Sequence, residues 1–150
     1  MPTLALDLAT KTGWALSGEP IASGVWDFSP RRHEGGGMRY LRFRQRLDEL
    51  VTLAGDVESI YYEEVAAHKG TAAAHIYGGL VAVLTTYCEE RRIPYSGVPV
   101  GQIKKAATGK GNANKPAMIA AARARGHNPA DDNEADALCL LHGVLDGKLE

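Results

Sequence analysis

The sequence predicts an α/β fold in which a mixed five-stranded sheet is flanked by helices. Before Ser29, three short apolar segments are joined by brief turns, as in an antiparallel meander. Further along, two more strand-like segments each follow a segment of helical periodicity. Helical crossovers of this kind connect parallel strands, so three antiparallel strands should be followed by two parallel ones.

The expected strands are residues 4–9, 13–16, 21–28, 59–65 and 94–100. The fourth reads SIYYEEV, and its β-branched and aromatic residues favour a strand. After the third strand, apolar residues repeat at helical spacing from Tyr40 to Ala54, with arginines on the other face. Three more helices are predicted over residues 71–91, 102–108 and 115–125. A last helix should begin near Asn128–Pro129, because Asn suits the N-cap and Pro the first turn. It should end at Val144 or Leu145.

The composition is that of an ordinary globular protein. A chain of 150 residues, with 45% hydrophobic and 23% charged residues, is long enough for one domain with its own core. Cys88 and Cys139 lie far apart in apolar helical patterns, which favours buried, reduced thiols over zinc ligands. The sequence shows neither a signal-like start nor an apolar stretch of membrane-spanning length. We therefore expect a cytoplasmic protein with no membrane partner.

Basic residues gather in two places. The formal net charge of −1 excludes a uniformly basic nucleic-acid binder but not local patches. The arginine cluster consists of Arg31, Arg32, Arg39, Arg42, Arg44 and Arg46, and a lysine cluster consists of Lys104, Lys105, Lys110 and Lys115. The lysine cluster lies on a Gly- and Asn-containing stretch, whose backbone N–H groups can also approach phosphates. A solvated basic surface is the alternative interpretation.

Acidic residues occur at three separated places. Asp7 lies in the first apolar strand, although Asp is a poor strand former and its charge is costly to bury. Glu63 and Glu64 end the fourth strand. Asp132 and Asp136 share one face of the last helix at i, i+4 spacing. If the first and fourth strands are neighbours, Asp7 approaches one of the glutamates, and the last helix would have to bring its acids to the same place.

Each acidic segment also has a simpler interpretation. Asp7 can be a turn acid, the glutamate pair can point into solvent, and the run DDNEAD can be an acidic first helical turn. Jointly, the three segments favour one site. Such a cluster is repulsive unless it binds a hard divalent cation such as Mg²⁺ or Mn²⁺. Two such ions roughly 4 Å apart can hydrolyse phosphodiesters, one activating water and the other stabilising the leaving oxygen.

Four stretches, in this order, resemble the RuvC family of Holliday-junction resolvases, in the ribonuclease H-like superfamily. They are LALDLATKTGWAL, YYEEVAAHKGTAAA, VPVGQIKKAATGKGNANK and NPADDNEADALCLL. They are similar to the family's opening strand with Asp, its Glu-x-Val strand end, its basic stretch and its terminal Ala-Asp-Ala-Leu helix. The resemblance covers nearly the whole chain. The compact length and the Arg-rich insertion around residues 35–46 look more like a phage or prophage branch.

The resemblance implies that residues 1–150 form a single ribonuclease H-like nuclease domain that resolves four-way junctions with Mg²⁺, or Mn²⁺ as a substitute. Asp7, Glu63 and Asp136 match the family's catalytic, metal-binding acids. Counting back from the last acid places the remaining one at Asn133, whereas counting forward from Asn-Pro places it at Asp132. We prefer Asp132, because it shares a helix face with Asp136 and a charged oxygen binds Mg²⁺ better than an amide.

The resemblance also implies partners. Two symmetric cuts in a junction require a homodimer with a twofold axis, for which the apolar residues of helix 71–91, including Gly78–Gly79, are candidates. Core burial is a near-equal alternative for them. The residues expected to bind DNA are Lys69, Lys104, Lys105, Lys110 and Lys115. The arginine cluster can extend this surface. Ala66 stands where the family has an aromatic wedge, so junction opening should use another residue or a different DNA structure.

Other functions remain open at this stage. One is a less selective nuclease acting on flaps or RNA-containing duplexes, and another is a non-catalytic DNA-binding module, which requires that the acids do not converge. The pattern Asp7-x-x-Thr10-x-x-Gly13 also resembles the phosphate loop of actin-like ATPases and sugar kinases. Those proteins need a duplicated fold, for which this chain is too short, so we expect no nucleotide cofactor.

Overall fold

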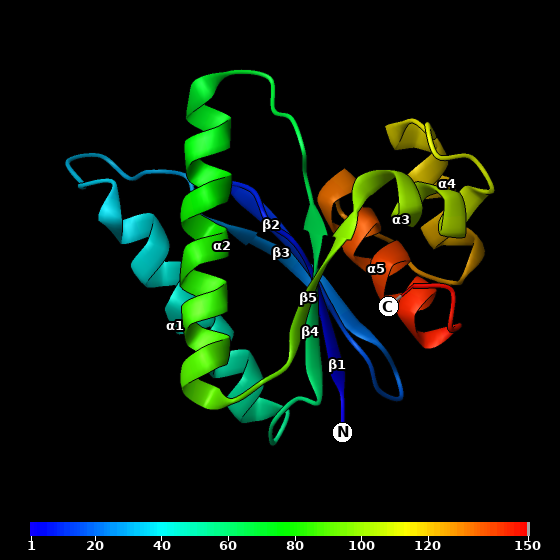
Figure 1. The fold of residues 1–150 in the computed structure, drawn as a ribbon, viewed down its shortest axis with the longest axis horizontal. Helices are drawn as coiled ribbons and strands as arrows, with labels where there is room; N and C mark the ends of the chain where they lie inside the picture. Colours follow the sequence, from blue (N-terminus) through cyan, green and yellow to red (C-terminus); the bar gives the residue numbers. More distant parts are fainter. Residues whose placement is uncertain (150) are drawn as a thin grey trace.

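The computed structural model describes residues 1–149, in which a five-stranded sheet has helices on both faces (Figure 1). The strands are β1 (Thr3–Asp7), β2 (Lys11–Leu16), β3 (Ala22–Asp27), β4 (Ser59–Glu64) and β5 (Tyr95–Pro99). Their order across the sheet is β3-β2-β1-β4-β5. β2 pairs antiparallel with β1 and β3, and β4 pairs parallel with β1 and β5. The predicted α/β fold is therefore confirmed.

The helices form two layers. They are α1 (Gly37–Leu53), α2 (Thr71–Arg91), α3 (Val100–Thr108), α4 (Lys115–Ala124) and α5 (Asp132–Leu145). α1 and α2 cover one face of the sheet, and α3, α4 and α5 lie on the other (Figure 1). Within residues 1–149, no helix has the length and apolar character needed to cross a membrane.

The two faces of β1 contribute to two different cores. Leu4 and Leu6 pack in the core shared with α1 and α2, whereas Ala5 packs in the core shared with α5. Because side chains alternate along a strand, Asp7 lies on the Ala5 face, toward α5. The same alternation along β4 puts Glu63 on the face of Tyr61, which packs in the α5 core.

Small residues let α5 lie close to the sheet. A Cβ added to Gly13 of β2 would lie only 2.0 Å from the carbonyl oxygen of Asn133, so this position requires glycine. Ala15 of β2 and Ala135 of α5 are both fully buried in the same core. The close approach brings the first turns of α5 to the edge of the sheet where β1 ends.

The start of α5 differs from the prediction. The expected N-cap at Asn128 was wrong, because the Asp131 side chain accepts a hydrogen bond from the Glu134 backbone N–H at 2.8 Å. The Glu134 carboxylate in turn accepts hydrogen bonds from the Ala130 N–H at 2.8 Å and from the Ser23 hydroxyl at 2.7 Å. The spacing Asp-x-x-Glu is a variant of the capping box and was visible in the sequence. β1 also ends earlier than expected, at Asp7 itself.

Candidate metal centre at the end of the sheet

Three carboxylates from three elements meet at one edge of the sheet. Asp7 is the last residue of β1, Glu63 is the penultimate residue of β4, and Asp136 lies in the second turn of α5. Each offers one oxygen, and these oxygens lie within 4.8 Å of one another. β1 and β4 are parallel neighbours, so their carboxyl ends share one edge, and α5 reaches it from the side. Within residues 1–149, no other group of three Asp, Glu, His or Cys side chains comes together in this way.

Burial and mutual repulsion keep protons on this cluster. Asp7 is only 8% exposed, and burial raises its pKa well above its usual range, with further increases from Glu63 and Asp136. Burial, followed by the charge of Glu63, raises the pKa of Asp136 to about 7. At neutral pH, Asp7 and Asp136 are therefore not both fully ionised unless more positive charge is brought to them.

The donor set fits a hard divalent cation. It consists of carboxylate oxygens alone, which is the chemistry that Mg²⁺, Mn²⁺ and Ca²⁺ prefer, and it lacks the thiolate or imidazole typical of zinc sites. A cation among these oxygens would also remove the repulsion that helps to raise the pKa values of Asp7 and Asp136. The acidic triad of Asp7, Glu63 and Asp136 is therefore compatible with binding a divalent metal ion.

The other acids predicted for this region lie differently. Asp132, the first residue of α5, is outside the triad, and its Oδ2 lies 3.6 Å from Nζ of Lys115. Its charge still contributes to the raised pKa of Asp136. Glu64 faces the opposite side of β4, where its carboxylate lies beside Gly97, as expected from the period-two alternation.

Two of the five predicted DNA-binding lysines lie beside the acids. Lys104 of α3 is near enough to Asp136 to oppose the rise in its pKa, and Lys115 of α4 pairs with Asp132. The other three, Lys69, Lys105 and Lys110, are exposed. Lys69 lies in the loop before α2, Lys105 on α3 and Lys110 just after it. Positive charge next to the acidic edge therefore comes from Lys104 of α3 and Lys115 of α4.

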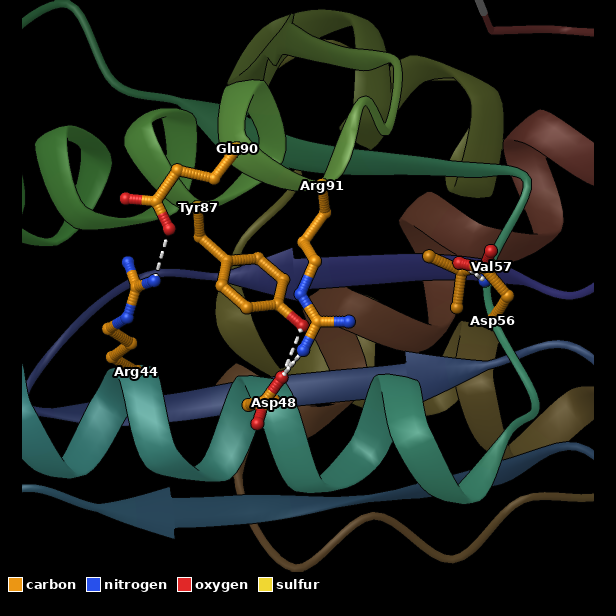
Figure 2. A network of polar contacts seen from close by, with 7 residues as sticks. All are labelled: Arg44, Asp48, Asp56, Val57, Tyr87, Glu90 and Arg91. Atoms are coloured by element: carbon orange, nitrogen blue, oxygen red, sulfur yellow. Dashed lines mark hydrogen bonds and ion pairs between the residues drawn. The ribbon is translucent and has the colours of Figure 1, made fainter.

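Half of the arginine cluster, by contrast, is paired with acids: Arg42, Arg44 and Arg46. Arg42 binds Glu34 through both guanidinium nitrogens, and Arg44 binds Glu90 of α2. Figure 2 shows Arg44 and Arg91 on either side of Tyr87, with Arg91 and the Tyr87 hydroxyl both bound to Asp48. The contacts of Arg44, Arg91 and Tyr87 join α1 to α2 on the face of the sheet away from α5.

Tyr77 of α2 holds the end of β4 in place, a role that sequence reasoning missed. Its hydroxyl donates to the Glu63 carbonyl oxygen at 2.7 Å and accepts from the Val65 N–H at 3.2 Å. The helical spacing of apolar residues around Tyr77 marked only a packing position. The hydrogen bonds of its hydroxyl depend on how α2 packs against the end of β4, and no local pattern in the sequence indicates that packing.

The architecture has counterparts among solved structures. Thermus thermophilus RuvC in complex with a Holliday junction substrate matches with a TM-score of 0.78 and 21% identity, over 100% of this chain and 98% of that one. A second Thermus thermophilus RuvC structure matches with a TM-score of 0.75 and 20% identity, over 100% and 99% of the two chains. This chain has the RuvC fold.

A more distant match is consistent with that fold. The yeast mitochondrial Holliday junction resolvase Ydc2 gives a TM-score of 0.58 at 12% identity, over 97% of this chain and 78% of that one. No protein-family model matches the sequence, and no curated protein matches it either. The RuvC resemblance seen in four short stretches of the sequence is thus confirmed as a likeness in fold.

Proposed function

We propose that this protein is a metal-dependent, structure-selective endonuclease that resolves four-way DNA junctions. The observation that carries the proposal is the convergence of Asp7, Glu63 and Asp136 at the end of a RuvC-type sheet. One RuvC structure with this fold is bound to a Holliday junction substrate, and Ydc2 is a Holliday junction resolvase. A non-catalytic module would have no use for three repelling carboxylates at a partly buried edge.

Asp7, Glu63 and Asp136 would hold the metal, with Asp132 as a fourth ligand on the same face of α5 as Asp136. Divalent ions bound there, Mg²⁺ with Mn²⁺ as a substitute, would activate a water molecule and stabilise the leaving oxygen. Asp7 would be the most rigidly held of these ligands, because it is buried and its strand, β1, is paired with β2 on one side and β4 on the other. Glu63 is oriented through the hydrogen bond that Tyr77 makes to its carbonyl oxygen.

Lysines would bring a polyanion to this acidic edge. Lys104 and Lys115 lie beside the acids, and the exposed Lys69, Lys105 and Lys110 would add further phosphate contacts. Contacts of this kind go to phosphates and carry little base preference. Two symmetric cuts call for a homodimer. Gly78 of α2 is exposed and suits such an interface, whereas Gly79 is already packed against Tyr40 within the chain.

The test compares a labelled four-way junction, a flap, an RNA–DNA hybrid and a linear duplex, each with Mg²⁺ or with EDTA. We expect paired, Mg²⁺-dependent nicks across the junction and little cutting of the linear duplex. Glu63→Gln should abolish cutting, whereas Glu64→Gln, on the adjacent residue but the opposite face, should leave it unchanged. Equal loss in both variants, or cutting that persists in EDTA, would overturn the proposal. Faster cutting of the hybrid or the flap than of the junction would instead indicate a less selective nuclease.

A further inference from the structure

A cleft of about 400 Å³ lies at the edge of the sheet where β1 ends, on the side of α2. One wall is the turn that continues β1 beyond Asp7, formed by residues 8–11. The opposite wall is the first part of α2, with Ala73, Ile76 and Tyr77. His68 and Asn133 complete the lining. The volume falls within the range of ordinary small-ligand pockets, roughly 300–1,000 Å³.

Each wall of the cleft is connected to one of the three acids. Leu8 follows Asp7 directly, and Asn133 lies one helical turn before Asp136 on α5. Tyr77 is hydrogen-bonded to the backbone of Glu63. The turn itself is pinned, because the Thr12 hydroxyl donates to the Ala9 carbonyl oxygen at 2.7 Å. The walls of the cleft are therefore built from the same segments that carry the three acids.

The lining has the chemistry of a nucleobase site. Ile76 and Leu8 give it an apolar floor, and the rings of His68 and Tyr77 lie against each other with centroids 4.8 Å apart. Bases stack on aromatic rings irrespective of their sequence. Asn133 and Thr10 supply hydrogen-bonding groups, and the exposed Lys11, which also lines the cleft, can neutralise a phosphate.

We propose that this cleft binds one unstacked nucleotide of the DNA strand that is cut. The inference rests on the proposed nuclease function and adds a reason for structure selectivity. A base inside a duplex must lose its pairing and stacking to enter, whereas a base at a branch point has already lost part of both. The cleft thereby favours branched DNA over linear duplex without reading any sequence.

The test fills the cleft from an exposed position. Ala73→Leu places a larger side chain on the cleft-facing side of α2, and Ala74→Leu, equally exposed but outside the lining, is the matched control. In Mg²⁺, Ala73→Leu should cut the junction roughly tenfold more slowly, the loss expected from one stacked base. Ala74→Leu should match the wild type. An abasic nucleotide at the bound position should slow the wild type to a similar extent and leave Ala73→Leu unaffected.

Binding is measured separately from cutting. Junctions that carry 2-aminopurine, in turn at each nucleotide near the branch point, are titrated with protein in Ca²⁺. One position should change its fluorescence with the wild type and Ala74→Leu but not with Ala73→Leu. If the wild type cuts junctions but Ala73→Leu behaves like the control in both assays, the cleft proposal is overturned and the nuclease proposal stands. If the fluorescence change occurs without Mg²⁺-dependent cutting, the nuclease proposal falls and nucleotide binding in the cleft is supported. If the wild type binds no junction, both are overturned.

Discussion

Charged side chains are arranged differently on the two sides of the sheet. Between α1 and α2, arginines and acids are matched in pairs, as with Arg44 and Glu90 or Arg91 and Asp48 (Figure 2). On the α5 side, three carboxylates meet at the edge of the sheet where β1 ends. Among residues 1–149, Asp7 has no cationic partner within hydrogen-bonding reach. Exposed pairs of the first kind contribute little to stability and leave little net charge. The second arrangement lowers the stability of the metal-free fold, and binding of a cation would relieve it.

The largest expected effect comes from removing one charge at the acidic edge. Asp7→Asn should reduce junction cleavage on the order of 10³-fold, the scale of one electrostatic group in a catalytic site. The same variant should raise the melting temperature of the metal-free protein at pH 8, because it removes a buried, repelled charge. Activity assays and thermal unfolding in EDTA measure the two effects. A variant that is both inactive and less stable would show that Asp7 is a structural residue.

Two glycine substitutions compare the packing of β2 against α5 with the packing of α2. Gly13→Ala should destabilise the protein by about 3 kcal/mol, because the new Cβ meets the Asn133 backbone and the start of α5 must move. Gly78→Ala should stabilise it by about 0.5–1 kcal/mol, because its Cβ meets nothing within 4 Å and alanine favours the helix. Denaturant unfolding measures both values. Similar stability changes for the two variants would contradict the close approach of α5 to β2.

Metal-free stability should fall as the pH rises. Asp7 and Asp136 have raised pKa values in the folded protein, so the folded chain holds protons that the unfolded chain has released. For Asp136 this window runs from its ordinary pKa of 3.8 to about 7. Stability is therefore highest below the window and is lost across it. Mg²⁺ should raise the melting temperature by roughly 5 °C at pH 8 and much less at pH 5.

The control for this measurement is Asp136→Asn, which should flatten the pH dependence and weaken the response to Mg²⁺. An equal Mg²⁺ response at pH 5 and pH 8 would mean that the ion stabilises the protein at a place other than these carboxylates.

The smallest effects are expected on the α1–α2 side, where arginines are paired with acids. Arg44→Gln breaks an ion pair whose two side chains are 40% and 53% exposed, so it should cost less than about 1 kcal/mol. It should also leave junction affinity nearly unchanged, because Glu90 already offsets the charge. Lys104→Gln, beside Asp136, should weaken junction binding and lower its salt dependence. Filter binding at several salt concentrations compares the two. A larger affinity loss for Arg44→Gln would place DNA on the α1–α2 face.

The sequence by itself determined the order and type of nearly every element. Thr71–Arg91 was predicted to the residue, because its helical periodicity is long and its ends are marked. The motif resemblance selected Asp7, Glu63 and Asp136 among the acids, and these three converge. The elements follow from local periodicity, which the linear chain contains, whereas the choice of acids came from the resemblance.

Only the tertiary structure decided what depends on contacts between distant segments. The Asp-x-x-Glu cap at Asp131 is a local pattern, but the hydrogen bond from Ser23 of β3 to Glu134 joins segments far apart in the sequence. Asp132 lies outside the triad and beside Lys115 of α4, a contact between two helices. The cleft beside Asp7 needs the β1–β2 turn, α2 and α5 together. Such features arise when segments far apart in the sequence pack against one another, and no local pattern encodes their distances.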